Sequence, residues 1–213
     1  GRGVKLLIEH TSINPNAAPH VGRVRNAIIG DILTNVLKFQ EYNVEVHYYV
    51  NDVSKQMAYL VLGAKGNEKF NDILNLYILM VKHLEQNPKK EKEIFEILRK
   101  VERGDKKTID KLNNLVKICL DGQKKILADL GIEYDFFDYE SKYLDKKRLN
   151  KILGDLKKTK RLKKDQENRL YLDQSKLEEN FEQKMKSAVL VLTRSDGTGL
   201  YVLRDILYTI DKL

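Results

Sequence analysis

The sequence contains a single cysteine and no long uninterrupted run of apolar residues, and both shortages exclude classes of protein. One cysteine, Cys119, can form neither an internal disulfide nor a cysteine-built zinc site, which suits a reducing cytoplasm. No apolar run approaches the ~20 residues of a membrane-spanning helix, and the N-terminus lacks the apolar segment of a signal peptide. We therefore expect a cytoplasmic protein that does not cross a membrane.

Charged residues are abundant by contrast, at 33% of the 213 residues, beside 42% hydrophobic residues. This balance indicates a globular protein with a heavily charged surface, long enough for one core and a sizeable insertion. The net charge of +8 favours polyanionic partners, because lysine and arginine neutralise phosphates and release counterions. A basic run at residues 145–164 holds ten Lys and Arg against two Asp, a pattern that is commonly just a solvated surface.

The N-terminal part of the chain is expected to form a strand, a loop, a helix and a second strand. Val4–Ile8 is a short apolar run typical of a buried strand, and residues 9–20 are polar, with prolines that disfavour a helix. Val44–Val50 is rich in β-branched and aromatic residues, which favours a strand. Between the strands, apolar residues recur at helical spacing from Gly22 to Gln40. The apolar residues at this spacing are Ala27, Ile28, Ile32, Leu33, Val36 and Leu37.

Strand–helix–strand units of this kind almost always join parallel strands of one sheet, so the pattern predicts an α/β fold. After Asn51 the chain becomes mainly helical, with helices expected near residues 57–61, 73–84, 94–101 and 109–130. Further expected elements are a strand at 132–138, a hairpin arm at 169–173, a buried strand at 188–193, a turn at 195–198 and a helix from about residue 204. The simplest organisation is a βαβ half-domain at 1–51, an insertion at 52–186, and the start of the other half at 187–213.

The loop between the first strand and the first helix is the best candidate for a ligand site. In open α/β sheets ligands bind at the carboxyl ends of strands, and a helix N-terminus offers free amides to phosphate. Gly22 would let a nucleotide approach the backbone closely, and His20 can donate a hydrogen bond to a phosphate oxygen. A capping histidine and a turn glycine explain the same two residues, so this pattern alone leaves both interpretations open.

Three blocks of sequence resemble arginyl-tRNA synthetases, archaeal ones especially. His20-Val21-Gly22-Arg23 resembles the His-x-Gly-His signature of class I aminoacyl-tRNA synthetases, and it is followed by a similar Arg-Asn-Ala-Ile-Ile-Gly-Asp helix. Residues 48–52 resemble the exit of the family's second strand, and residues 195–205 resemble its Ser-Asp-Gly-Thr-x-Leu-Tyr-x-x-Arg-Asp stretch. The resemblance covers residues 4–62 and 187–213 well, and the middle only as an insertion. It implies a Rossmann-like class I synthetase nucleotide-binding core interrupted by a mainly helical insertion.

The same resemblance implies an arginine–tRNA ligase, a monomer that uses ATP and Mg²⁺ to activate L-arginine and transfers it to the acceptor end of tRNA. Matching positions assign His20, Gly22 and Arg23 to ATP, with His20 and Arg23 as catalytic residues and no metal ligand from the protein. The basic residues 145–164, beyond their interpretation as solvated surface, become candidates for contact with the tRNA acceptor arm.

Four further residues match the family's arginine-binding positions. Glu9 and Asn14 match the positions that hold the amino acid's backbone end and guanidinium side, and Tyr201 and Asp205 match those that flank and pair with the guanidinium. A planar cation with five donors suits a carboxylate in bidentate geometry. The structural alternatives are a solvated strand end for Glu9, an Asx turn for Asn14, and a helix cap or salt bridge for Asp205.

Several departures from the family pattern support a second hypothesis, in which a catalytically inactive fragment or paralogue binds ATP, arginine or tRNA without ligation. Arg23 stands where the family has histidine, and Ala17-Ala18-Pro19 lacks a cation present in the usual Lys-Pro-Leu-like approach. The chain also ends before the family's Lys-Met-Ser-Lys-Ser-like loop. A different nucleotidyltransferase is disfavoured by the block at 195–205. His47 and Cys119 are expected to be packing residues.

Overall fold

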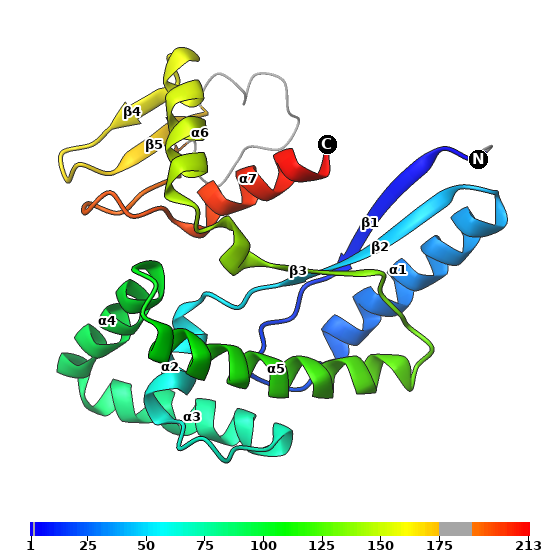
Figure 1. Ribbon diagram of the computed structural model, residues 1–213, viewed down its shortest axis with the longest axis horizontal. Helices are drawn as coiled ribbons and strands as arrows, with labels where there is room; N and C mark the ends of the chain where they lie inside the picture. The colour runs from blue at the N-terminus through cyan, green and yellow to red at the C-terminus, as the bar shows by residue number, and fades with distance from the viewer. Residues whose placement is uncertain (2, 175–188) are drawn as a thin grey trace. The chain divides into compact units, whose positions relative to one another are not determined.

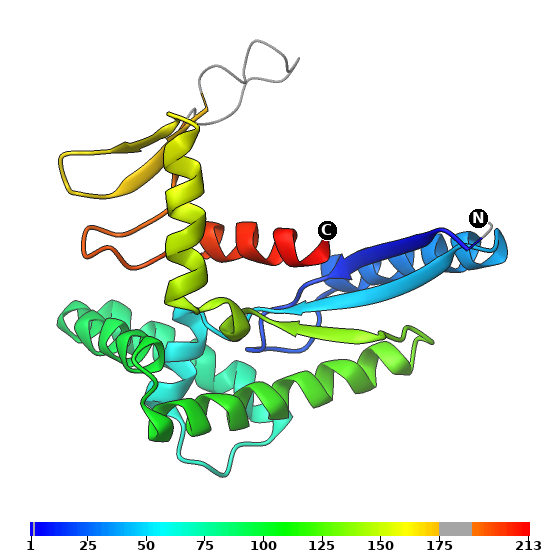
Figure 2. The same cartoon turned by 45° about the horizontal axis from the view of Figure 1, so that its top comes forward.

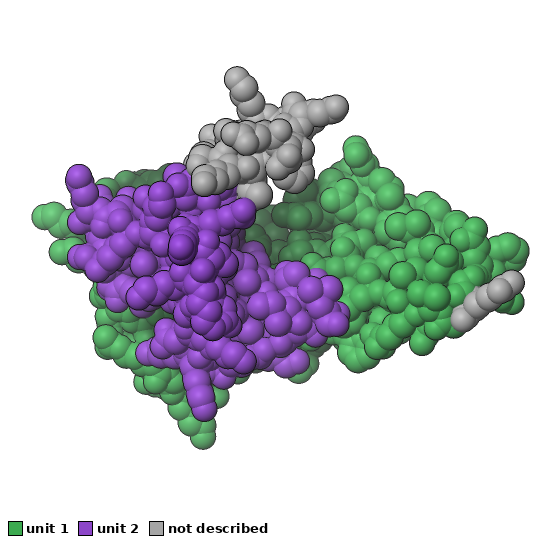
Figure 3. Space-filling model, turned by 90° about the horizontal axis from the view of Figure 1, so that it is seen from above, with its two compact units in different colours: residues 1–141 green, residues 142–213 purple. Residues whose placement is uncertain are grey.

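The computed structural model describes residues 1, 3–174 and 189–213, which divide into two compact units (Figure 3). The first unit is Gly1–Ser141 and the second is Lys142–Leu213. The βαβ segment and the helices that follow it therefore belong to one unit. The sequence also predicts a half-domain at 1–51, an insertion at 52–186 and the start of the other half at 187–213. These two compact units do not test that division, so it stays a prediction.

The first unit begins with a βαβ segment whose strands are parallel, as the sequence predicts (Figure 1). It comprises β1 (Lys5–Thr11), α1 (Val21–Phe39) and β2 (Asn43–Val50), and β3 (Phe136–Tyr139) later pairs in parallel with β2 to give the order β1-β2-β3. β1 extends past Ile8 to Thr11, with an irregular register between Glu9 and Thr11, so the prediction that the polar loop starts at Glu9 was wrong.

α1 packs along the sheet through small side chains. Ala27, Gly30 and Thr34 are its buried residues, and their spacing places them on one helix face. A Cβ at Gly30 would lie 2.2 Å from His10 Cβ, so only glycine allows this approach of α1 to β1. Of the apolar residues at helical spacing, Ala27 is buried and Leu37 half-buried, whereas four large residues are exposed by 41 to 58%. These four are Ile28, Ile32, Leu33 and Val36.

Four α-helices follow β2 and pack on one another with α2 in contact with the other three (Figure 2). They are α2 (Lys55–Gly63), α3 (Phe70–Gln86), α4 (Glu91–Glu102) and α5 (Lys106–Ala128), and the 3-10 helix η1 (Pro88–Lys90) precedes α4. Two side chains accept the backbone N–H groups that begin helices: Ser54 for α2 and Asp105 for α5. The core of this part includes the fully buried Met57, Leu60, Ile73, Ile94 and Leu115. The helices expected near residues 57–61, 73–84, 94–101 and 109–130 are thus confirmed.

The second unit combines a small antiparallel sheet with two helices. Its elements are α6 (Lys146–Lys158), β4 (Leu162–Lys164), β5 (Leu170–Asp173), β6 (Val189–Val191) and α7 (Tyr201–Lys212), in the sheet order β4-β5-β6, and the 3-10 helix η2 (Glu140–Tyr143) crosses the boundary between the units. The predicted hairpin arm is β5, and its partner β4 lies inside the basic run. The strand predicted at 188–193 is β6, with residue 188 outside the described residues. α7 begins three residues before the predicted start.

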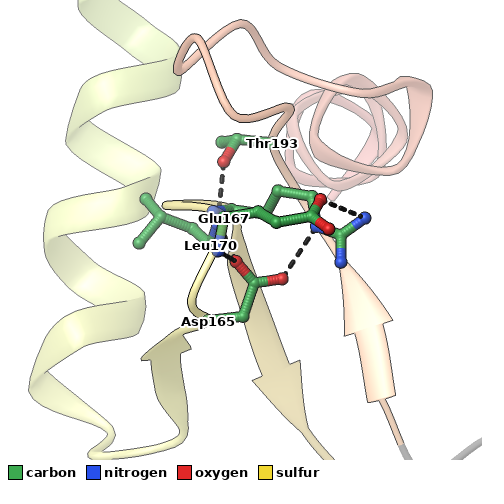
Figure 4. Close-up of polar contacts among 5 residues, drawn as sticks. Asp165, Glu167, Leu170 and Thr193 are labelled. Carbon is green, nitrogen blue, oxygen red and sulfur yellow. Dashed lines mark hydrogen bonds and ion pairs between the residues drawn. The ribbon is translucent and has the colours of Figure 1, made fainter.

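The β4–β5 hairpin closes through Asp165, whose carboxylate accepts hydrogen bonds from the backbone of Glu167 and Arg169 and from the Arg169 guanidinium at 2.7 Å (Figure 4). Leu170 N donates to the buried Thr193 hydroxyl at 2.9 Å, which ties the hairpin to the segment after β6. Within the described residues, no helix has the length and apolar character that crossing a membrane requires.

Candidate functional site

The signature histidine lies at the N-terminus of α1. His20 occupies the N-cap position, and its carbonyl accepts from Arg23 N at 2.9 Å and Val24 N at 3.1 Å. Its side chain makes no capping hydrogen bond and is exposed. A Cβ at Gly22 would lie 3.2 Å from His20 Cε1, so the glycine makes room for the ring. The capping alternative therefore explains the backbone of His20 but not its imidazole, which remains available to a ligand.

This end of α1 has the electrostatics of an anion site. The amides of Val21 and Gly22 bond no residue in the described part of the chain. The first turn contains no acidic residue, and both Arg23 and Arg25 are exposed. Free amides, the positive end of the helix dipole and nearby cations all favour a phosphate group. The predicted nucleotide residues His20, Gly22 and Arg23 are thus brought together at one helix end.

Asn14 lies in the loop between β1 and α1, and its amide is held by a helix. Asn14 Nδ2 donates to Gln56 Oε1 on α2 at 2.6 Å, and Asn16 Nδ2 reaches the same oxygen at 3.4 Å. Gln56 in turn hydrogen-bonds Tyr77 on α3. The Asn14 side chain therefore bonds another element instead of forming an Asx turn, and its Oδ1 remains free to accept from a ligand.

Glu9 lies near the carboxyl end of β1 with an exposed side chain. The next residue, His10, points to α1, donates or accepts a 2.8 Å hydrogen bond with the Thr11 hydroxyl, and lies 5.3 Å from the Tyr134 ring. Because successive strand residues alternate, Glu9 faces the opposite side of the sheet. Burial lowers the pKa of His10, although the Asp31 carboxylate opposes this. Burial also raises the pKa of Tyr134 to about 12, so its hydroxyl stays protonated and donates to Thr11.

Tyr201 and Asp205 both lie in the second unit, at the start of α7. Their spacing of four residues places them on one face of the helix, and both are exposed, Tyr201 by 62%. The helix N-cap is Leu200, so Asp205 does not cap α7. The preceding turn is organised by Asp196, which accepts from the Thr198 amide and hydroxyl. The structure thus presents two sets of predicted arginine-binding residues, one in each unit.

Two expected packing residues are buried or paired as the sequence predicts. His47 Nδ1 lies 2.6 Å from Asp138 Oδ2, and its ring stacks on Phe136. Cys119 is buried, and burial raises the pKa of its thiol to about 12, which keeps it protonated and unreactive.

The basic run forms α6, β4 and the turn between them, with its lysines exposed. The buried residues of α6 are Leu149 and Ile152. The run is therefore a solvated surface in this structure. As for metals, the residues placed by the structure contain no group of three or more His, Cys, Asp and Glu side chains that could hold an ion.

Sequence reasoning missed two glutamines that contact the loop before His20. Gln56 precedes the buried Met57 on α2, and Gln123 is completely buried on α5. A signal for Gln123 was present, because it continues the apolar spacing of Leu115, Cys119 and Leu127 with a polar residue. A buried amide in such a stripe requires hydrogen-bond partners, but the sequence does not say where they lie.

The fold is that of a class I aminoacyl-tRNA synthetase core. Residues 2–213 match a family model described as tRNA synthetases class I (R), catalytic domain. The chain belongs to this arginine-specific family, which confirms the predicted resemblance and the predicted fold class.

Relatives and solved structures agree with that placement. The chain is 38% identical to the arginine–tRNA ligase of Methanocaldococcus jannaschii, covering 100% of this chain and 39% of the relative. It is 39% identical to that of Methanosphaera stadtmanae, covering 96% and 36%. It is similar to the Thermus thermophilus arginyl-tRNA synthetase structure, with a TM-score of 0.71, 27% identity, and coverage of 98% and 36%. The chain thus spans well under half the length of the relatives it matches.

Proposed function

We propose that the protein containing this chain is an arginine–tRNA ligase that converts L-arginine and ATP to arginyl-adenylate and pyrophosphate and then transfers arginine to the tRNA acceptor end. The observation that carries the proposal is the open N-terminus of α1, where His20, Gly22 and Arg23 surround free amides. The family match over residues 2–213 supports the amino-acid assignment. The same proposal has the protein act as a monomer in the cytoplasm.

ATP would bind at this helix end. His20 would donate to phosphate oxygens, Gly22 would allow the nucleotide close to the backbone, and Arg23 would supply positive charge. Magnesium ordinarily keeps several water ligands and binds through substrate phosphates. The described residues contain no group of three or more His, Cys, Asp and Glu side chains that could hold an ion. Mg²⁺ would therefore bind together with ATP and neutralise its phosphates.

Four residues are proposed to bind arginine. Asn14 Oδ1 is an unoccupied acceptor that suits a guanidinium donor, and Glu9 supplies a carboxylate for the α-ammonium group. Tyr201 and Asp205 would flank and pair with the guanidinium from one face of α7. The exposed basic residues 145–164 would contact the tRNA acceptor arm, whose phosphates they can neutralise.

In the first step, an arginine carboxylate oxygen attacks the α-phosphorus of ATP and pyrophosphate leaves. In the second, a ribose hydroxyl at the tRNA 3′ end attacks the arginyl carbonyl and AMP leaves. The chain's own residues contribute by aligning the reactants and by stabilising phosphate charge in a preorganised site, and the protein forms no covalent bond.

Arg23 supports a second candidate function, binding without ligation. An arginine keeps the positive charge of the signature but cannot reproduce the short reach and orientation of an imidazole. The test is arginine-dependent pyrophosphate exchange by the protein expressed from its complete reading frame, with tRNA present and lysine as the control amino acid. We expect pyrophosphate exchange with arginine and none with lysine. Binding of ATP and arginine without exchange would favour the second candidate, and no binding would contradict both.

A further inference from the structure

The loop between β1 and α1 is fastened to the rest of its unit mainly by side chains. Residues 12–19 carry Asn14 and lead into His20, yet only one described backbone–backbone hydrogen bond joins two of them, from Asn16 N to Asn14 O at 2.8 Å. An irregular segment with so few internal bonds does not define its own conformation. The contacts that fix it come from elements distant in the sequence.

Gln123 on α5 makes the most extensive of these contacts. Its Nε2 donates to the carbonyl of Ala17 at 2.8 Å and to that of Asn14 at 3.1 Å, and its side chain is 0% exposed. Backbone carbonyls only accept hydrogen bonds, so the amide can face them only with its nitrogen. The orientation of Gln123 is therefore determined by its partners.

Tyr48 on β2 completes the arrangement. Its hydroxyl donates to Gln123 Oε1 at 2.8 Å and accepts from the backbone N–H of Ile13. Burial raises the pKa of Tyr48, which keeps the donor proton in place. Tyr48 and Gln123 thus hold the loop at Ile13, Asn14 and Ala17, and we call this pair the clasp.

We propose that Gln123 and Tyr48 are positioning residues for the arginine site. The clasp fixes the backbone of Asn14, and Gln56 then directs the Asn14 side chain so that Oδ1 faces the ligand. This inference rests on the proposed function, because it assigns a role within the same site. It also makes α5, which lies far from the signature in sequence, part of the support of that site.

The first test measures the loop without any activity assay. Gln123→Glu keeps the side-chain size and an oxygen for Tyr48, but it places a carboxylate against two carbonyl oxygens. Hydrogen exchange of the amides in residues 13–20 should accelerate by on the order of tenfold, the effect of losing about one net hydrogen bond. Exchange in residues 94–101 should not change. Gln86→Glu, the same substitution at an exposed site, is the control for charge. Unchanged exchange in 13–20 would overturn the proposal.

The second test uses steady-state pyrophosphate exchange by the full-length protein. Gln123→Glu and Tyr48→Phe should raise the KM for arginine by on the order of tenfold, while the KM for ATP stays within about twofold. Leu127→Ala, an apolar buried change on the same helix, controls for lost stability. Equal effects on arginine and ATP, or the same split in Leu127→Ala, would overturn the proposal. If the unaltered protein activates no arginine, the proposed function fails. The hydrogen-exchange experiment still decides whether the clasp holds the loop.

Discussion

Arg23 stands at the fourth position of His20-Val21-Gly22-Arg23, where the resemblance to class I synthetases implies a histidine. Its side chain is exposed in the first turn of α1, next to two free amides. A guanidinium there retains the charge that attracts ATP, but it is longer than an imidazole and hydrogen-bonds in a fork. Arg23 can therefore attract the nucleotide through its charge without aligning the phosphates as an imidazole would.

Arg23→His should raise the rate of arginine activation, because imidazole restores a short donor at the phosphate. The gain should lie in kcat with a smaller change in the KM for ATP, as expected for an interaction made mainly in the transition state. Pyrophosphate exchange measures both constants. Arg103→His, at the exposed C-cap residue of α4, should have little effect. An unchanged or lower rate in Arg23→His would show that arginine is a working substitute.

His10 makes a prediction about pH. Burial lowers its pKa below the usual 6.5, so the folded state holds the neutral ring more strongly than the unfolded chain does. Its contribution to stability is therefore present above pH 6.5 and is lost as the pH falls through the lowered pKa.

Urea denaturation between pH 7.5 and pH 5 should show a fall in the free energy of unfolding that is smaller in His10→Asn. Identical pH dependence in the two proteins would contradict a buried neutral His10.

At the scale of elements, α1 shows what a sequence pattern can and cannot predict. The helix itself follows from its apolar periodicity, but the packed face is set by Ala27, Gly30 and Thr34, which the pattern counts as weakly apolar or polar. Small residues form the packed face because they let α1 approach β1 closely, and large apolar side chains there would prevent this approach. The antiparallel sheet of the second unit was missed in part because β4 is three residues long and lies within a basic run.

Candidate site residues follow the same logic. His20 and Gly22 could be located because their motif is contiguous and sits at a strand–helix junction. Gln123 could not be placed, since its partners Asn14 and Ala17 are more than a hundred residues away in the chain. Pairings of that separation depend on the assembled fold, which a local pattern does not encode.

A glycine comparison tests the packing of α1. Gly30→Ala should destabilise the protein by about 1–3 kcal/mol, because the new Cβ would overlap His10. Gly154→Ala, within α6, meets no atom within 4 Å and should stabilise the protein by about 0.5–1 kcal/mol through helix propensity. Chemical denaturation of both variants measures the sign of each change in the free energy of unfolding. A stabilising Gly30→Ala would mean that α1 and β1 are not in this close contact.

At the scale of the whole molecule, the residues proposed to bind arginine are divided between the two compact units. Asn14 belongs to the first unit, and Tyr201 and Asp205 belong to the second. A substitution in α7 that selectively abolishes arginine binding would therefore support the proposed role of this helix.

Asp205→Asn should weaken arginine binding by on the order of a hundredfold and leave ATP binding nearly unchanged, since charge-assisted hydrogen bonds contribute roughly 1.5–3 kcal/mol each. Calorimetric titration of arginine, lysine and ATP, with tRNA present, measures this, and lysine should bind poorly throughout. Asp211→Asn on the same helix removes an ion pair with Arg148 and serves as the control. Equal arginine affinity in the Asp205→Asn and unaltered proteins would make Asp205 a structural residue.

The buried thiol of Cys119 offers a way to watch the loop directly. It is the only sulfhydryl in the chain, and its Sγ lies 3.6 Å from the Ala17 carbonyl that the clasp also holds. A thiol-reactive probe can modify it only when α5 and the loop separate. The labelling rate therefore counts these separations at a single atom, and arginine or ATP should slow it if either ligand closes the loop onto the helix.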